Sequence, residues 1–312
     1  MLRIGNDMIR NIPKVSVIIP TYNCAKYLSA AIGSVLSQTC QDFEIVVVDD
    51  GSTDNTSEIV ADYLNNFPNR IKYLYQNNHG IACARNFGIK NSVGEYIALL
   101  DADDILLPEK LEKSLLAFAD KKEIGLVHTG VLCINETGEL LKQEILQDDY
   151  QNRMKKNLSG KIFKQLFFRE AHICTSSVIL KKECIDKVGL FDEYLSYLGC
   201  EDRDLWLKIA EKYEIAYVDL PLVYYRIRRN SMSKNFAKML KARYYVIEQA
   251  CLRNKLSIFT KRKAYSNLHA EISYGYQVLN NKSFAWIEAI KSIKYFPFNI
   301  KPYKRLIRIL LS

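Results

Sequence analysis

Two aspartates, Asp101 and Asp103, follow a short apolar stretch from Glu95 to Leu100 that we expect to form a β-strand. Residues two apart at a strand end project to the same side, so the two carboxylates converge. Mg²⁺ and Mn²⁺ commonly take one or two protein carboxylates and complete their coordination with phosphate oxygens and water. The D-x-D pair (Asp101 and Asp103) therefore indicates a divalent-cation site, while the alternative is a polar turn that simply ends the strand.

A second acidic pair, Asp49 and Asp50, follows another apolar stretch, from Glu44 to Val48. A carboxylate at such a strand end can accept a hydrogen bond from a nucleotide base or a ribose hydroxyl. The alternative is a turn in which Ser52 or Thr53 caps the following helix and the acids favour its N-terminus.

Arg85 lies in a stretch, Ile81 to Lys90, with the pattern of a helix. Near a cation and a diphosphate, an arginine would add positive charge to the leaving group, although an ordinary exposed helical arginine is the alternative. Glu201 and Asp202 begin an apolar helix whose dipole favours acids there. The glycine-containing turn before them could also aim one carboxylate into a cleft, where a general base must lie.

These residues are positioned by an alternation of apolar strands and amphipathic helices from residue 15 to about residue 118. Repeated strand–helix units imply an α/β fold with a mostly parallel sheet covered on both faces. Ligands bind such sheets at the carboxyl ends of the strands. Three of those ends, at 20–23, 49–52 and 101–104, are polar, and the topology places them on one edge.

The pattern changes after about residue 125. We expect a hairpin formed by residues 125–134 and the segment after 135–138, helices near 161–169 and 204–213, and strands near 176–180, 215–218 and 222–227. After about residue 235 the chain is predicted to be helical, rich in Lys, Arg and Tyr.

Composition narrows the class of protein. The 312 residues are 48% hydrophobic and 25% charged, which is typical of a globular chain. The formal net charge is +9, and residues 241–312 carry 14 Lys and Arg against 3 Asp and Glu. A basic tail on a near-neutral body favours anionic lipid or an acidic partner over nucleic acid.

Other features favour a cytosolic compartment and weigh against several large classes of protein. The eight cysteines form no C-x-x-C pair, which favours reduced thiols, and the N-terminus carries charges unlike a secretory signal. P-loop, dinucleotide-binding and G-x-S-x-G motifs are not present in the sequence, so those nucleotide-binding and hydrolase classes lack support.

Six stretches, in their order and spacing, resemble the family 2 glycosyltransferases, inverting enzymes with the GT-A fold. They are VSVIIPTYN (15–23), DFEIVVVDDGSTDNT (42–56), ARNFGI (84–89), GEYIALLDADD (94–104), VGLFDEYL (188–195) and EDRDLWLKIA (201–210). The resemblance covers about residues 14–232. It implies a Rossmann-like nucleotide-binding sheet with a mixed acceptor-side extension, divided into a nucleotide-sugar half (14–104) and an acceptor half (105–232). An N-terminal extension (1–13) and a basic helical C-terminal region (233–312) flank this domain.

The resemblance also implies roles for single residues. The residues it assigns to the nucleotide are Pro20, Thr21, Tyr22, Asp49, Asp50, Arg85, Asp101 and Ala102. Among them, Asp50 would contact the base. Asp103, with Asp101, would hold Mn²⁺ or Mg²⁺, and Asp202 would be the catalytic base.

Arg228 departs from the family pattern. Members often have a histidine in a Tyr-Arg-x-His-x-x-Ser stretch, and here residues 225–231 read YRIRRNS, with Arg228 at the histidine position. An arginine cannot ligate a metal but could contact phosphate. We assign Glu201 and Arg228 to the acceptor side of the site.

The function that the resemblance implies is single-displacement, metal-assisted transfer of a hexose or N-acetylhexosamine from a nucleotide sugar, UDP-linked by preference, to a saccharide. Many bacterial relatives use lipid-linked acceptors to build O-antigen, capsule or lipooligosaccharide. The aromatic and basic tail, residues 284–311, suits the surface of an anionic membrane. A peripheral position on the inner face of the cell membrane follows from that interpretation, and a helical cap with a solvated basic face is the alternative.

Two other functions remain open from the sequence. A sugar-1-phosphate nucleotidyltransferase would use a Gly-rich, basic first loop, whereas residues 20–23 read PTYN. A non-catalytic glycosyltransferase-like binding module would not need Asp101, Asp103 and Asp202, which are all present. The sequence does not identify the donor sugar, the acceptor or the linkage.

Overall fold

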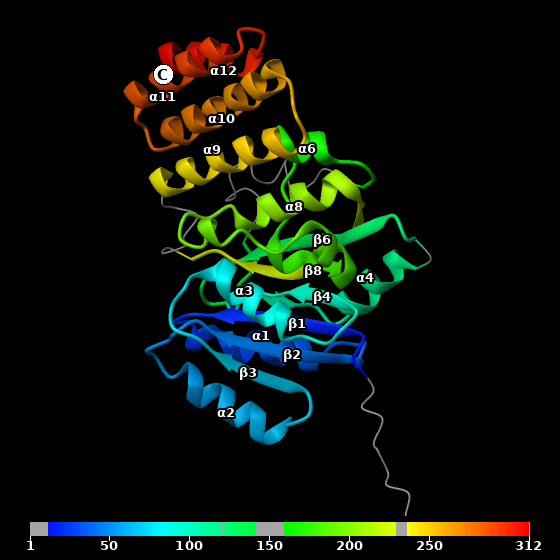
Figure 1. Cartoon of the computed structure of the whole chain (residues 1–312). Coiled ribbons are helices and arrows are strands. Elements are labelled where there is room, and N and C mark those ends of the chain that lie inside the picture. Colours follow the sequence, from blue (N-terminus) through cyan, green and yellow to red (C-terminus); the bar gives the residue numbers. More distant parts are fainter. Residues whose placement is uncertain (1–11, 120, 142–158, 229–235, 312) are drawn as a thin grey trace, which may run out of the picture.

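The computed structural model describes residues 12–119, 121–141, 159–228 and 236–311. Within these residues the strands form one eight-stranded sheet in the order β3-β2-β1-β4-β7-β6-β8-β5 (Figure 1). Most of the expected N-terminal extension (1–11), the end of the YRIRRNS stretch (229–231) and the start of the C-terminal region (233–235) lie outside the described residues.

The first half of the sheet is parallel, as the alternation of strands and helices predicts. β1 pairs with β2 and β4, and β2 pairs with β3, all in parallel. The strands are β1 (Val15–Thr21), β2 (Phe43–Asp49), β3 (Ile71–Tyr75) and β4 (Tyr96–Leu99). The connecting helices are α1 (Ala25–Leu36), α2 (Thr56–Asn66) and α3 (Ile81–Lys90).

The second half of the sheet is mixed, which confirms the expected extension. β7 is antiparallel to both β4 and β6, β8 runs parallel to β6, and β5 is antiparallel to β8. The strands are β5 (Ile105–Leu106), β6 (Ile124–Ile134), β7 (Val178–Lys181) and β8 (Glu214–Arg226). The helices are α4 (Lys110–Phe118), α6 (Phe163–Phe167), α7 (Lys182–Val188) and α8 (Glu201–Lys212), with single 3₁₀ turns at η2 (Thr175–Ser177) and η3 (Glu193–Leu195).

One expected break in the sheet is wrong. The two short strands predicted at 215–218 and 222–227 are the single strand β8. Its pairing with β6 shifts register around Gly130, which lies opposite Pro221. Proline has no N–H to donate, and a bulge lets the strand continue past it.

The expected cap of α2 is also wrong. The N-cap residue is Asn55, and the carboxylate of Asp54 accepts from the N–H and the hydroxyl of Thr56. The hydroxyl of Ser52 instead accepts from the backbone N–H of Asn23 at 3.0 Å. Ser52 therefore fastens the loop after β1 and leaves the helix end to Asp54.

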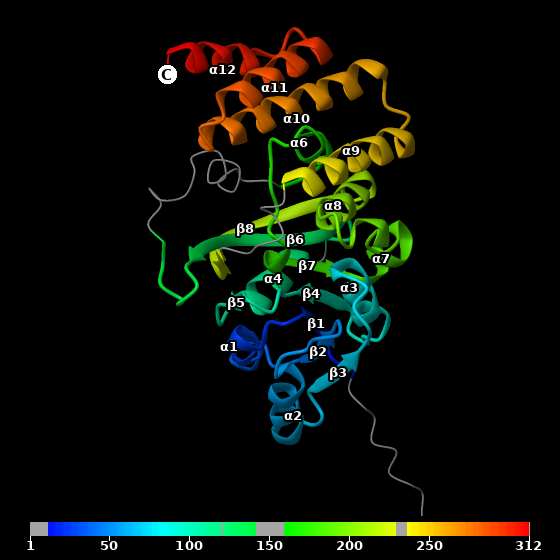
Figure 2. The same cartoon turned by 90° about the vertical axis from the view of Figure 1, so that its left-hand side faces the viewer.

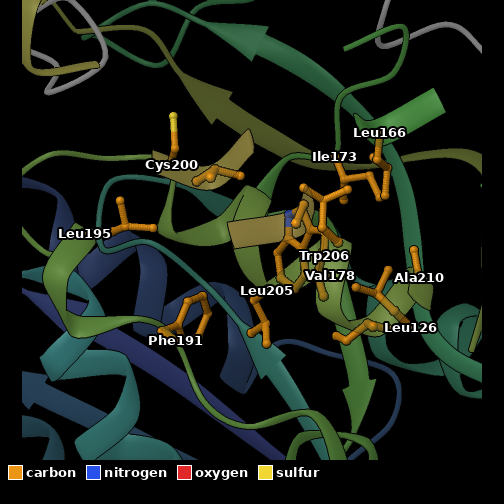
Figure 3. Packing of buried hydrophobic residues seen from close by; sticks show 14 of the residues in the cluster. Leu126, Leu166, Ile173, Val178, Phe191, Leu195, Cys200, Leu205, Trp206 and Ala210 are labelled. Atoms are coloured by element: carbon orange, nitrogen blue, oxygen red, sulfur yellow. The ribbon is translucent and has the colours of Figure 1, made fainter. Parts of the chain in front are cut away.

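Side chains of the strands alternate between two hydrophobic layers, as buried parallel strands require. Val17 and Ile45 face the layer that contains α1 and α4, whereas Ile18 and Val46 face the layer of α3 and α8. At the centre of the second layer, Trp206 of α8 is packed among aliphatic side chains of the sheet and the surrounding loops (Figure 3).

The C-terminal helices form a stack on α8, at the end of the molecule opposite α2 (Figures 1 and 2). They are α9 (Phe236–Arg253), α10 (Ile258–Val278), α11 (Lys282–Tyr295) and α12 (Ile300–Leu311). Val246 of α9 and Leu268 of α10 belong to the same buried cluster as Trp206. Arg253 of α9 also forms an ion pair with the buried Asp204 of α8, at 3.1 Å. The helical region thus continues the core that supports α8.

None of the helices in the described part of the chain is both long enough and apolar enough to cross a bilayer.

Candidate active site

The loops that follow β1 and β2 are fastened together at the polar edge of the sheet. The N–H of Asp50 donates to the carbonyl of Thr21 at 2.9 Å. The side-chain oxygen of Asn23 accepts from the N–H of Thr53 at 2.8 Å. Asn23 has a φ of 49°, a left-handed conformation that asparagine tolerates better than most residues. The first two strand ends therefore behave as one unit.

Asp50 is buried and holds the loop between β3 and α3. Its carboxylate accepts from the side chain of Gln76 at 2.6 Å and from the N–H groups of His79 and Gly80 at 2.9 and 2.8 Å. These three donors position a loop of the polar edge around Asp50. Its predicted contact with a nucleotide base stays a prediction.

Asp49 also accepts hydrogen bonds from its neighbours. Its two oxygens accept from the N–H of Ser52 at 2.8 Å and from the hydroxyl of Tyr73 at 2.7 Å. Burial and the neighbouring Asp49 carboxylate raise the pKa of Tyr73, so the phenol remains a donor. Asp49 therefore joins the start of the β2–α2 loop to β3.

The three residues predicted to line the nucleotide pocket differ in exposure. Pro20 and Thr21 are buried in β1, whereas Tyr22 is 52% exposed at its end. The Thr21 hydroxyl is buried and has no hydrogen-bond partner among the residues described. Tyr22 is therefore the member of the three that offers a broad surface.

Arg85 is 3% exposed, so the interpretation as an ordinary exposed helical arginine is wrong. Its Nη1 donates to Glu201 at 2.6 Å and its Nη2 donates to Asp101 at 2.7 Å. Burial opposes the charged guanidinium, but Asp101 and Glu201 raise the pKa of Arg85 above its ordinary value. A charged arginine thus links the D-x-D pair to the start of α8.

Glu201 and Asp202 follow a turn of two left-handed residues, Gly199 (φ 86°) and Cys200 (φ 66°). A side chain at Gly199 would be strained at this φ and would lie 2.6 Å from the sulfur of Met239, so the turn favours glycine. Burial raises the pKa of Glu201, and the Arg85 guanidinium opposes that rise. The carboxylate of Glu201 is therefore committed to Arg85, and Asp202 is the adjacent acid that Arg85 does not hold.

The 3₁₀ turn η2 brings Asp202 beside the D-x-D pair. Thr175 donates to Asp202 at 3.3 Å. The next residue, Ser176, donates to the buried Asp104 at 2.5 Å and accepts from the N–H of Asp101 at 3.1 Å. Sequence reasoning missed both hydroxyl residues, and the only signal for them was the Thr-Ser-Ser run itself.

Asp103 lies among charged groups. Its carboxylate accepts from Nε of Arg228 at 2.7 Å. Burial and the Asp101 carboxylate raise the pKa of Asp103, while Arg228 lowers it. Burial, followed by Asp103, raises the pKa of Asp104 well above its usual range. Ala102 is buried between the two acids of the D-x-D pair.

A second arginine fixes the backbone at this turn. Arg226 donates through Nε to the carbonyl of Asp103 at 2.8 Å, and its N–H donates to Asp104 at 2.9 Å. The guanidinium groups of Arg226 and Arg228 lie 4.8 and 5.8 Å from the ring centre of Tyr27. Tyr27 and Arg226 are further site residues that the sequence patterns did not single out.

The D-x-D pair fits a hard divalent cation. Its side chains are 30% (Asp101) and 18% (Asp103) exposed. Arg85 uses one oxygen of Asp101 and Arg228 uses one oxygen of Asp103, so each carboxylate has a second oxygen outside these ion pairs. Carboxylate oxygens are the donors that Mg²⁺ and Mn²⁺ prefer.

Comparison with known proteins decides the family. The family model "Glycosyl transferase family 2" matches residues 16–189, more than half of the chain. The chain belongs to this family. This family 2 glycosyltransferase is 35% identical over 261 residues to an uncharacterized glycosyltransferase of Rickettsia conorii, which covers 81% of this chain and 40% of the relative. The chain therefore spans less than half the length of that relative.

Solved structures show the fold of this glycosyltransferase. S. aureus TarS (residues 1–349), crystallised with UDP-GlcNAc, superposes with a TM-score of 0.62 at 22% identity over 90% of this chain and 81% of that one. GalNAc-T7, crystallised with UDP, GalNAc and Mn²⁺, gives a TM-score of 0.60 at 19% identity over 77% and 48%. The predicted GT-A fold with additional C-terminal helices is confirmed.

Proposed function

We propose that this glycosyltransferase transfers a hexose or N-acetylhexosamine from a UDP-sugar to a saccharide acceptor with inversion of configuration. The observation that supports this best is the contact path between the D-x-D pair and the start of α8. It runs from Asp101 through Arg85 to Glu201, and from Asp101 through Ser176 and Thr175 to Asp202. A group that holds the leaving diphosphate and a group that activates the acceptor would then be neighbours.

Asp202 is the proposed general base. Its carboxylate takes the proton of an acceptor hydroxyl as that oxygen attacks the anomeric carbon. The bond between the anomeric carbon and the phosphate oxygen breaks on the opposite side, and its electron pair leaves with UDP. One displacement of this kind inverts the anomeric centre, so an α-linked donor gives a β-linked product.

Asp101 and Asp103 would hold Mn²⁺ or Mg²⁺ against the diphosphate. When bound, such a cation neutralises charge that develops on the leaving UDP. Arg85 holds Asp101 in place, and Arg226 anchors the backbone at Asp103. The ligands of the structural relatives, UDP-GlcNAc with TarS and UDP with Mn²⁺ in GalNAc-T7, support the choice of donor and metal.

The acceptor side is proposed to lie at an anionic membrane surface, with a lipid-linked saccharide as acceptor. On α12, four exposed apolar side chains follow helical spacing: Ile300, Tyr303, Ile307 and Leu310. Exposed Lys301, Lys304 and Arg308 lie along the same helix. Pro302 and Ile309 are buried against the other helices. An apolar stripe beside a basic stripe suits the headgroup region of anionic lipid.

The test is a panel of UDP- and GDP-sugars, scored by nucleotide release in the presence of Mn²⁺, with two variants of adjacent acids. Asp202→Asn should keep UDP binding and reduce kcat by about 10²- to 10⁴-fold, the usual contribution of a general base. Glu201→Gln keeps the shape of the side chain. Its kcat should fall much less, because the carboxylate of Glu201 binds Arg85 and does not act as the base. A near wild-type kcat for Asp202→Asn would show that Asp202 is not the general base.

A further inference from the structure

The ion pair between Arg228 and Asp103 joins the end of the β8 segment to the D-x-D pair. The two atoms, Nε and Oδ2, are 2.7 Å apart, and the side chains are 35% and 18% exposed. A partly buried pair of this kind is screened less by solvent than a surface pair. Arg228 therefore neutralises a carboxylate to which the proposed function assigns a divalent cation.

Different groups hold the backbone and the carboxylate of Asp103. Its carbonyl accepts from Arg226 at 2.8 Å, and Arg226 is held in turn by the carbonyl of Asn135 at 3.0 Å. Its carboxylate is held by Arg228. Arg228 can thus leave the carboxylate while the turn that carries Asp103 keeps its position.

Among the described residues, the other direct contacts of Arg228 are weak. It lies over the ring of Tyr27 at 5.8 Å, and its Nη1 is 3.8 Å from the sulfur of Cys24. Neither is an anion that could replace Asp103. A diphosphate would be such an anion, because guanidinium groups bind phosphate oxygens through paired, charge-assisted hydrogen bonds.

A divalent cation and a guanidinium that share one carboxylate repel each other. Binding of a cation at Asp103 alone would therefore oppose the existing ion pair and leave Arg228 without its partner. Binding of the cation together with a diphosphate gives Arg228 a new anion and leaves Asp103 to the metal. Each ligand then increases the affinity of the protein for the other, and thermodynamic linkage makes the two increases equal.

We propose that Arg228 exchanges Asp103 for the diphosphate of the donor, and that this exchange makes cation binding and nucleotide binding cooperative. The proposal rests on the proposed function, since it uses the same cation and nucleotide. It places Arg228 beside the donor diphosphate and not on the acceptor side, and it predicts weak binding of the cation to the free enzyme.

The experiment measures Mn²⁺ binding at equilibrium, by electron paramagnetic resonance of free Mn²⁺, with and without UDP or GDP. In the wild-type protein, UDP should tighten Mn²⁺ binding about 10-fold or more, within the usual range of coupling between sites. Arg228→Ala should bind Mn²⁺ alone more tightly than wild type, and the tightening by UDP should shrink to about 2-fold. Arg228→Lys, which keeps a point charge, should retain more of the coupling than Arg228→Ala.

Arg70→Ala is the matched control. It also removes one arginine, whose half-buried side chain donates to Gln41 at 2.6 Å. This variant should match wild type in both measurements. A damaged fold in Arg228→Ala would weaken Mn²⁺ binding, so the predicted gain in affinity separates the proposed role from a structural one.

Two results would overturn the inference, and they are distinguishable. If Arg228→Ala binds Mn²⁺ alone no more tightly than wild type, while UDP still tightens binding in both, the exchange is wrong and the proposed function stands. If neither UDP nor GDP affects Mn²⁺ binding to the wild-type protein, the proposed function is overturned together with the exchange.

Discussion

Asp101 and Glu201 bind the two Nη atoms of one buried guanidinium, that of Arg85, at 2.7 and 2.6 Å. Asp101 ends the parallel half of the sheet, whereas Glu201 begins α8 in the other half. A single side chain therefore fixes the distance between the proposed cation site and the helix that carries Asp202.

Replacement of Arg85 should destabilise the protein. Arg85→Met leaves two acids without their partner, and loss of one side of a buried ion pair costs about 3–5 kcal/mol. Urea denaturation should show a lower free energy of unfolding by this amount. Addition of Glu201→Gln should recover part of the loss, because one uncompensated charge is then gone. Equal stabilities of Arg85→Met and the control Arg70→Ala would contradict this role of Arg85.

Removal of divalent cations should abolish sugar transfer. We expect EDTA to stop turnover and added Mn²⁺ or Mg²⁺ to restore it, because Asp101 and Asp103 supply the oxygen ligands that these ions prefer. The control is the same concentration of EDTA saturated with Mn²⁺ beforehand. Full activity in the metal-free chelator would show that the D-x-D pair acts without a cation.

Lys110 should make stability depend on pH. It is 1% exposed in α4, and its Nζ donates to Ser114 at 2.9 Å. Burial lowers its pKa from 10.5 to about 7. Between these two pH values the unfolded chain holds a proton that the folded chain lacks, so the contribution of Lys110 to stability rises with pH.

The measurement compares Lys110→Met with wild type at pH 7 and pH 10. Relative to wild type, the variant should gain about 1–4 kcal/mol of stability between pH 10 and pH 7, because one pH unit in this range corresponds to about 1.4 kcal/mol at most. The difference should shrink towards pH 10. Lys113→Met, on the same helix but paired with Glu109 at the surface, should show no such trend. If the difference in stability between Lys110→Met and wild type does not change with pH, the pKa of Lys110 is not lowered in the folded protein.

Charge reversal on α12 should weaken binding to vesicles that contain phosphatidylglycerol. Each basic residue near an anionic surface contributes about 1 kcal/mol, so Lys304→Glu with Arg308→Glu should reduce co-sedimentation about ten-fold or more. The control, Lys90→Glu with Lys122→Glu, makes the same charge change at exposed positions outside the C-terminal helices. Identical binding by the two double variants would argue against α12 as the contact. A 1–240 truncation is unsuitable, because α9 and α10 form part of the core.

Local patterns predicted much of the fold. The apolar stretches at 15–19 and 44–48 are β1 and β2, and the helical spacing at 81–90 is α3. Pairing between distant strands was harder to predict from the sequence. β8, for example, continues past Pro221 only because of its irregular pairing with β6. Hydrophobic period reports local structure, whereas strand order and register depend on contacts between distant segments.

The sequence indicated many residues of the candidate site but not the contacts between them. The sequence singled out Arg85 and Glu201 separately, but no pattern indicates that they form an ion pair. Thr175 and Ser176 were missed because hydroxyl side chains are common in turns and carry no distinctive spacing. The contacts of these residues with the donor and the metal stay predictions.

The ion pair between Arg253 and Asp204 has a consequence for how the enzyme would lose activity on heating. Asp204 is two residues from Asp202, and its partner belongs to α9. Loosening of the C-terminal stack would therefore disturb both the start of α8 and the hydrophobic cluster that the stack shares with β1 and β2. Activity and fold would then be lost together on heating, because one hydrophobic cluster spans the helical stack and the sheet.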